Sequence, residues 1–300
     1  MRLTYYTGQN FGDALNPLIF EHFLNANVLN SSSDVELLGI GTIFGIKQSA
    51  LKKVVFSSGV SDNESIYGPI PHIDERYDIR AVRGPLTAQA LNLPPECAVT
   101  DGAALIKTVF PRSVESVPGR VGFIPHHKSL GFYDSWPAIA DKAGLVFLDV
   151  RKDPEVFIQE LWKCESVVTE AMHGAIVADT YGIPWIPIKL YSHISEFKWM
   201  DWASSVQVEM MFRTSKSRLH SPDFFANLMV QRGLPLFISK SLAPALLRWR
   251  IQKTVQWLRS VSDEEGYLSD RTHLNSLIDE LLRRLKKLRM DYSPKDVSYH

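Results

Sequence analysis

Cysteine and net charge are the two things that this sequence most clearly lacks. Only two cysteines occur among its 300 residues, Cys97 and Cys164, and no C-x-x-C pair is present. This argues against a disulfide framework or a cysteine-based zinc site and fits a reducing compartment. The 33 basic residues balance 33 acidic residues, so the composition does not indicate a nucleic-acid-binding protein.

Long apolar runs and familiar catalytic motifs are absent as well. No stretch of about 18 apolar residues occurs, so no membrane-spanning helix is expected. Residues 1–6 are too quickly polar for a signal peptide, and we therefore expect a cytoplasmic protein. There is no H-E-x-x-H, G-x-S-x-G, Walker, G-x-G-x-x-G or D-x-D motif. Because Asp13, Asp101 and Asp179 are also far apart in the sequence, we expect neither a metal nor a cofactor.

What the sequence does contain is an alternation of apolar, strand-like runs with helical patterns. In the first third, each predicted strand ends in a turn before a helix, which is typical of a parallel sheet with right-handed crossovers. A helix is predicted over about 16–26. The predicted strands are residues 3–7, 35–40, 53–57, 78–82 and 98–100.

The same alternation restarts after residues 107–120, which have the composition of a linker. The second set of strands is predicted at residues 121–124, 145–149, 166–169 and 184–188, with helices at 154–163 and 173–181.

Leucines at helical spacing from about residue 241 predict a C-terminal pair of helices. We therefore predict an α/β fold with two Rossmann-like lobes facing each other across a cleft, followed by these helices. The first lobe covers residues 1–112, the second 120–240 and the helices 241–300. The helices are expected to pack back on the first lobe, because their apolar stripe needs burial.

The most informative segment runs from Thr169 to Ile186. It is predicted to form a strand, a tight turn, a helix and a second strand, which places His173 and Gly174 at a helix N-terminus beside the carboxyl end of a parallel strand. Such a position suits an anion, and a histidine beside it can act as an acid. The alternative is a buried structural histidine.

Two further segments carry polar side chains at predicted strand ends. Asn10, Gly12, Asp13 and Asn16 open the first predicted helix, either as an acceptor-binding loop or simply as a helix cap. Arg83 ends the predicted strand 78–82, where its guanidinium can bind a carboxylate or phosphate. The alternative for Arg83 is a surface ion pair.

The corresponding edge of the second lobe is rich in cations. His126, His127 and Lys128 follow its first predicted strand and favour an anion clamp over a metal site, since adjacent histidines point in different directions. Lys189 and Lys198 follow a later strand and are within reach of the same cleft. For all of these residues the alternative is simple exposure to solvent.

Six short motifs, taken in order, resemble the polysaccharide pyruvyl transferase family, and in particular its exopolysaccharide ketal-forming members of the succinoglycan type. The likeness covers roughly residues 1–200. The motifs are Asn-Phe-Gly-Asp-Ala-Leu-Asn (10–16), Gly-Ile-Gly-Thr (39–42), Ser-Ser-Gly-Val (57–60), Val-Arg-Gly-Pro-Leu-Thr-Ala (82–88), Thr-Asp-Gly-Ala-Ala-Leu (100–105) and Met-His-Gly-Ala-Ile-Val-Ala (172–178).

This resemblance implies a fold like that of GT-B glycosyltransferases, with phosphoenolpyruvate as the donor and a sugar of an exopolysaccharide, or of its lipid-linked repeat unit, as the acceptor. The family motif Arg-Leu-His-Gly reads Ala171-Met172-His173-Gly174 here, and His126-His127-Lys128 stands where the family tends to have an arginine. Two donor-binding arginines are thus missing.

We assign roles to residues on this basis. His173 is the predicted acid and Asp13 the predicted base. The predicted acceptor residues, on the first lobe, are Asn10, Gly12 and Asn16, and the predicted donor residues are Arg83, His126, His127, Lys128, Gly174 and Lys189.

Two other functions fit the same pattern. A nucleotide-sugar glycosyltransferase of the same fold would use Asp179 as a ribose-binding acid, and a non-catalytic glycan-binding relative would explain the missing arginines. The basic end of the last helix, together with Trp249 and Trp257, predicts peripheral contact with the inner face of a membrane, where a lipid-linked acceptor lies. The basic residues are Arg283, Arg284, Lys286, Lys287 and Arg289.

Overall fold

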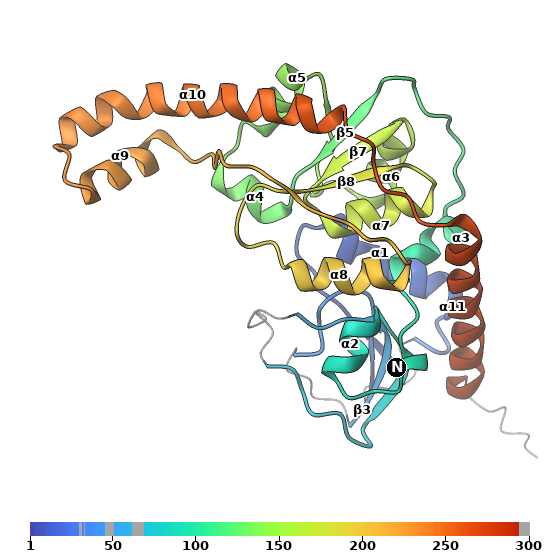
Figure 1. Ribbon diagram of the computed structural model, residues 1–300. Helices are drawn as coiled ribbons and strands as arrows, with labels where there is room; N and C mark the ends of the chain where they lie inside the picture. The colour runs from blue at the N-terminus through green and yellow to red at the C-terminus, as the bar shows by residue number, and fades with distance from the viewer. Residues whose placement is uncertain (30–31, 33, 46–50, 62–68, 294–300) are drawn as a thin grey trace, which may run out of the picture.

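The computed structural model describes residues 1–29, 32, 34–45, 51–61 and 69–293. It contains two separate parallel β-sheets with helices packed around them, which confirms the predicted α/β class with C-terminal helices (Figure 1). The first sheet has the order β1-β2-β3-β4. Its strands are β1 Arg2–Thr4, β2 Val35–Leu38, β3 Lys52–Ser58 and β4 Tyr77–Val82.

The second sheet has the order β6-β5-β7-β8-β9, and all of its pairs are parallel. Because β6 lies on one side of β5 and β7 on the other, the connections reverse direction between β5 and β7. Open α/β sheets bind ligands at such a switch point, beyond the carboxyl ends of the strands. The strands are β5 Val121–Ile124, β6 Val146–Phe147, β7 Ser166–Thr169, β8 Trp185–Lys189 and β9 Arg213–Thr214.

Helices connect and cover both sheets. The α-helices are α1 Phe11–Phe23, α2 Pro85–Ala90, α3 Ile106–Val109, α4 His127–Phe132, α5 Trp136–Ala143, α6 Pro154–Trp162, α7 Met172–Thr180, α8 Glu196–Ser205, α9 Pro222–Gln231, α10 Leu236–Ser262 and α11 Arg271–Tyr292. Two short 3₁₀ helices are η1 Pro95–Cys97 and η2 Gly102–Leu105. No helix in the described ranges is both long and apolar enough to cross a bilayer.

Three predicted boundaries are wrong. The first helix begins at Phe11, five residues earlier than predicted, because Asn10 caps it and accepts a hydrogen bond from the Gly12 N–H. The predicted strand 98–100 is reduced to a single bridge between Val82 and Ala98. Helix α10 begins at Leu236, before the predicted boundary at 241.

The first and second lobes, meaning the parts of the chain that carry the first and second sheets, share one apolar core. Phe11 of α1 stacks on Phe157 of α6, with ring centroids 3.8 Å apart. The Phe11 N–H also donates to the Val150 carbonyl at 2.8 Å. Helix α1 therefore belongs to the first lobe in sequence but is held against the second, and its N-terminal residues are positioned by both.

The C-terminal helices have two different environments. Helix α11 lies against the first lobe, where the Arg284 guanidinium donates to the carbonyls of Arg80 and Glu96, and Arg80 pairs with Asp291. Helix α9 and the N-terminal part of α10 instead extend away from both sheets (Figure 1). The C-terminal part of α10 packs on the second lobe, where Leu258 and Val261 are buried and Arg259 donates to the Lys142 carbonyl of α5. The buried stripe of α11 is Leu274, Ile278, Leu281, Leu285 and Leu288.

Candidate active site

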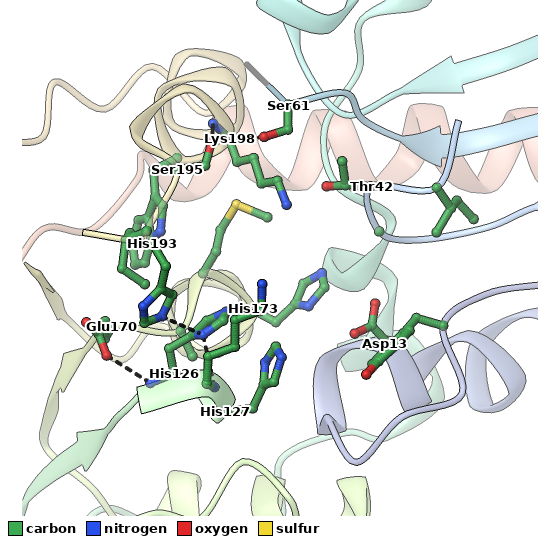
Figure 2. A pocket seen from close by; sticks show the side chains of 18 of the residues that line it. Asp13, Thr42, Ser61, His126, His127, Glu170, His173, His193, Ser195 and Lys198 are labelled. Carbon is green, nitrogen blue, oxygen red and sulfur yellow. Dashed lines mark hydrogen bonds between the residues drawn. The ribbon is translucent and has the colours of Figure 1, made fainter. Parts of the chain in front are cut away.

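A cavity of about 470 Å³ opens between the two lobes, beyond the carboxyl ends of β5 and β7 (Figure 2). Its size falls within the roughly 300–1,000 Å³ typical of small-molecule sites. The first lobe contributes Tyr6, Asp13, Gly41, Thr42, Ile43 and Ser61. The second lobe contributes His126, His127, Lys128, Glu170, Ala171, Met172, His173, Ser192, His193, Ile194, Ser195, Lys198 and Trp199.

His173 sits in the first turn of α7, directly after β7, as predicted. Its side chain is nine-tenths buried and forms part of the cavity wall. Its Nε2 lies 3.9 Å from Oδ2 of Asp101, which caps η2 in the first lobe. This distance is too long for a hydrogen bond, so Asp101 does not fix the ring.

Gly12 explains how the imidazole of His173 fits between the lobes. A Cβ at position 12 would lie 2.0 Å from His173 Nδ1, so only glycine leaves room for the ring. Gly12 is in the first turn of α1, which is held against the second lobe. The first lobe therefore determines where the His173 side chain stands.

Asp13 lies on the same side of the cavity as His173 (Figure 2). Its Oδ2 accepts a hydrogen bond from Asn10 Nδ2 at 2.5 Å. Burial raises the pKa of Asp13, while the charges of His173 and Lys198 act in the opposite direction. A carboxylate with a raised pKa at the rim of a cleft suits a general base.

Three histidines form the opposite wall. His126 Nδ1 is 3.1 Å from His193 Nε2, and the rings of His126 and His127 are 4.2 Å apart. Burial is the main cause that lowers the pKa values of His127 and His193 to about 4, and nearby Lys128 lowers both further. Burial likewise lowers the pKa of His126 well below its usual value. All three rings are thus uncharged at neutral pH before any ligand binds.

The buried carboxylate of Glu170 holds the backbone of this histidine wall in place. It accepts hydrogen bonds from the backbone N–H groups of His126, Leu190 and Tyr191 and from the Ser129 hydroxyl. Burial raises the pKa of Glu170 to about 7, although these four bonds favour its charged form. The carboxylate ties the turn after β5 to the turn after β8, which fixes the distance between His126 and His193.

Helix α8 supplies the remaining cation. Ser195 caps α8, and the Lys198 side chain extends from this helix into the cavity (Figure 2). The N-termini of α7 and α8 both begin at the cavity, so two sets of backbone N–H groups and two partial positive charges face it. Together with Lys128 and Lys198, they make the cavity suitable for an anion with more than one charge.

The structure thus brings five of the predicted site residues to one cavity: His173, Asp13, His126, His127 and Lys128. The other predicted residues do not line it. They are Arg83, Lys189, Gly174, Asn10, Gly12 and Asn16.

Arg83 is fully buried and holds the lobes together. Its Nε donates to Asp201 Oδ2 of α8 at 2.9 Å, and Nη2 donates to the Val60 carbonyl at 2.6 Å. Asp201 also accepts from the backbone N–H and the hydroxyl of Thr87. With its guanidinium occupied in this way, Arg83 fits neither predicted role, the anion ligand or the surface pair.

Lys189 and Gly174 also have other partners. Lys189 pairs with Glu196 outside the cavity. Gly174 lets α7 approach the sheet, because a Cβ there would lie 2.8 Å from Thr169 Oγ1 and 3.1 Å from the Ile124 side chain. Lys198, which has the same sequence features as Lys189, is the lysine that reaches the cavity.

The predicted acceptor residues support the site rather than face it. Asn16 is fully buried, where its side chain bonds the backbone N–H and carbonyl of Ile40. Asn10 caps α1 and holds Asp13, and Gly12 accommodates His173. The observed structure leaves none of these three side chains for contact with a sugar in the cavity.

Glu170 and His193 were missed by sequence reasoning. Glu170 directly follows the buried strand at residues 166–169, and this position at a strand end is a sequence signal that could have identified it as a site residue. His193 lies four residues after β8, and no sequence pattern indicated that it belongs to the site. Asp179 also differs from its interpretation as a ribose-binding acid: it is buried and holds Ser269, Trp185 and Arg271.

Comparison with known proteins identifies the family of this chain. Residues 10–191, more than half of the chain, match the polysaccharide pyruvyl transferase family. The chain belongs to this family. It is 33% identical over 223 residues to the succinoglycan biosynthesis protein ExoV of Rhizobium meliloti (strain 1021), covering 69% of this chain and 66% of that protein. It therefore spans just under two thirds of the length of that relative.

Among solved structures, similarity is found to a functionally uncharacterised protein from Klebsiella pneumoniae subsp. pneumoniae NTUH-K2044. The TM-score is 0.41 and the sequence identity 14%, over 71% of this chain and 93% of the other.

Proposed function

We propose that this protein transfers the pyruvyl group of phosphoenolpyruvate to a sugar of an exopolysaccharide, or of its lipid-linked repeat unit, and forms a pyruvate ketal. Membership of the polysaccharide pyruvyl transferase family supports the reaction class, and the name of the relative supports an exopolysaccharide as acceptor. The observation that carries the proposal is His173, which stands between Asp13 and Asp101 beside a cation-lined cavity.

The donor is recognised by charge. Phosphoenolpyruvate carries a carboxylate and a phosphate, close to three negative charges. Lys128, Lys198 and the N-termini of α7 and α8 offset this charge without a metal or a cofactor. His126 and His127 add to it once the bound anion raises their pKa values. These residues take the place of the two family arginines that the sequence lacks.

His173 acts as the acid. Its imidazolium turns about the Cβ–Cγ bond and gives a proton to the methylene carbon of the donor. The carbon–carbon double bond opens, and C2 acquires oxocarbenium character. A first sugar hydroxyl adds to C2 while Asp13 takes its proton.

The second half of the reaction closes the ketal. Phosphate leaves from C2 with the proton that Asp13 had taken. A second hydroxyl of the same sugar then attacks C2 and gives its proton to the neutral imidazole of His173. The products are one ketal and one inorganic phosphate, so the reaction needs no oxidant or reductant. Such proton transfers contribute roughly 10²–10⁴-fold to the rate.

The test is phosphate release from phosphoenolpyruvate with a panel of galactosides and glucosides. Isothermal titration with phosphoenolpyruvate and with uridine nucleotides separates this proposal from a nucleotide-sugar glycosyltransferase. Binding of uridine nucleotides without binding of phosphoenolpyruvate overturns it. Binding of glycan without any phosphate release favours the non-catalytic alternative.

We also propose peripheral contact with a membrane, at a surface that keeps the predicted Trp249, which is 52% exposed, but not the basic end of α11. The apolar stripe of α11 is buried on the first lobe. Residues 222–249, here called the arm, instead extend into solvent (Figure 1). Leu236 and Phe237 are 51% and 75% exposed at its tip.

The charge of the arm favours an anionic lipid surface. Arg232, Lys240 and Arg248 are exposed on it, and Asp223 is the one acidic residue between positions 222 and 249. Apolar side chains beside lysine and arginine are the features of helices that lie in a membrane interface.

A further inference from the structure

The acceptor in the proposed reaction is one sugar within a longer saccharide. The adjacent sugars of that saccharide must therefore extend out of the cavity, past its rim. The first-lobe residues predicted to bind the acceptor do not line the cavity. The rim of the second lobe has a continuous row of aromatic rings that nothing above has used. It begins at His193, a residue of the cavity wall, and ends outside the cavity on α9.

The row consists of His193, Phe132, His220 and Phe224, here called the aromatic row. The ring centroid of Phe132 lies 5.7 Å from that of His193 and 5.4 Å from that of His220. The rings of His220 and Phe224 are stacked, with centroids 4.0 Å apart and an interplanar angle of 23°. Buried Tyr191 supports the row, at 4.8 Å from Phe132 and 5.6 Å from His220.

Two features set the row apart from ordinary core packing. Phe132 and Phe224 are 41% and 45% exposed, whereas buried phenylalanines such as Phe225 next in sequence are almost completely covered. The row also comes from three separate parts of the chain, namely α4, the turn after β8 and the start of α9 with His220 two residues before it. The fold therefore holds these partly exposed rings in contact with one another, in continuity with the cavity.

We propose that the aromatic row binds the sugars next to the one that receives the pyruvyl group. This proposal rests on the proposed function for its choice of ligand. A sugar ring has an apolar face of C–H groups that stacks on an aromatic ring, while its hydroxyls remain in water. Burial lowers the pKa values of His193 and His220, so both rings are uncharged at neutral pH and stack like phenylalanine.

The test compares short and long acceptors. The probes are a methyl galactoside, a methyl glucoside and the oligosaccharide repeat unit prepared from succinoglycan without its pyruvyl groups. We expect the wild-type protein to bind the oligosaccharide at least about tenfold more tightly than either glycoside, a difference of about 1.4 kcal/mol. In the double variant Phe132→Ala/Phe224→Ala this advantage disappears, while affinity for the methyl glycosides and for phosphoenolpyruvate stays the same.

The controls separate ring stacking from folding. Phe132→Tyr/Phe224→Tyr keeps both rings and restores the oligosaccharide affinity. Met290→Ala removes a side chain that is 71% exposed on α11, away from the row, and changes no affinity. Thermal unfolding and size-exclusion chromatography of each variant accompany the titrations.

Each result has a defined meaning. If the wild-type protein does not prefer the oligosaccharide, or the double variant keeps the preference, the row proposal is overturned. It is also overturned if the double variant changes the oligomeric state, since the row is then an interface between two copies. If phosphoenolpyruvate does not bind but the oligosaccharide preference is observed, the proposed function is overturned and the proposed saccharide site is not.

Discussion

The imidazole of His173 and the carboxylate of Asp101 face each other across the junction of the two lobes, with Nε2 3.9 Å from Oδ2. Neither atom has a hydrogen-bond partner within the described part of the chain, and both are buried. The other carboxylate oxygen of Asp101, Oδ1, accepts a hydrogen bond from the Ala103 N–H at 2.9 Å, so Oδ2 is the oxygen that faces the ring. The second lobe supplies the proposed acid, and the first lobe supplies the carboxylate beside it.

Replacement of His173 tests this relationship directly. We expect His173→Ala to lower kcat by roughly 10²–10⁴-fold, because the proton transfer to the methylene carbon is lost. The melting temperature and the affinity for phosphoenolpyruvate are expected to change little. Wild-type rates in His173→Ala would rule out its role as the acid.

Replacement of Gly12 tests the position of the His173 imidazole in a second way. Gly12→Ala places a Cβ against His173 Nδ1, so we expect the imidazole to be displaced and kcat to fall. The matched control is Gly131→Ala, because a Cβ at position 131 meets nothing within 4 Å. Steady-state kinetics of both variants check the prediction. Equal kcat values for the two variants would contradict it.

Proton uptake accompanies donor binding if the histidine wall holds the anion. The pKa of His127 is about 4 in the free protein, so its ring is neutral at pH 7. A bound phosphate or carboxylate raises this pKa, so the complex holds more protons and the affinity rises as the pH falls from about 8 to about 6. Calorimetry in two buffers with different heats of ionisation measures the uptake.

The control for this measurement is His127→Gln, which keeps a hydrogen-bond donor but does not titrate. It is expected to take up fewer protons than the wild-type protein on binding. The calorimetric titrations are made at about pH 7.5 or above, roughly one unit or more above the second pKa of a phosphate monoester near 6, so that the donor's own phosphate contributes little to the uptake. Proton release on binding would show that the histidines do not face the anion.

The buried pair of Arg83 and Asp201 is expected to stabilise the junction of the lobes. Asp201→Asn leaves the Arg83 guanidinium buried without its counter-charge, which typically costs about 3–5 kcal/mol in the free energy of unfolding. Urea denaturation measures the loss. Glu160→Gln removes a partner of accessible ion pairs and serves as the control with little expected effect. If Asp201→Asn is as stable as this control, Arg83 and Asp201 do not hold the lobes together.

Membrane contact is tested at the tip of the arm. We expect Leu236→Ser/Phe237→Ser to lose most of the co-sedimentation with vesicles that contain phosphatidylglycerol, because two exposed apolar side chains no longer insert. Binding of the wild-type protein is expected to weaken in high salt, since Arg232 and Lys240 contribute through charge. Met290→Ser, on α11, is the control. Binding that is insensitive to both salt and the double substitution would exclude this contact.

The sequence by itself determined the α/β class, most strand and helix positions and the place of His173. These follow from local signals: buried strands read as short apolar runs, and a turn before a helix marks the carboxyl edge of a sheet. The strand at Ser166–Thr169 and the helix that begins at Met172 lie within a residue of their predicted bounds. The turn His126-His127-Lys128 was located in the same way.

Only the tertiary structure decided which polar side chains meet in the cavity. Arg83 and Asp201 are 118 positions apart, and nothing local indicates that one neutralises the other. Lys189 and Lys198 are equivalent as sequence signals, but Lys189 ends β8 and Lys198 lies in the first turn of α8. Lys189 therefore pairs with Glu196, whereas Lys198 reaches the cavity. Local pattern specifies elements, whereas burial and charge pairing depend on how two sheets pack, and that packing is set by contacts between residues distant in sequence.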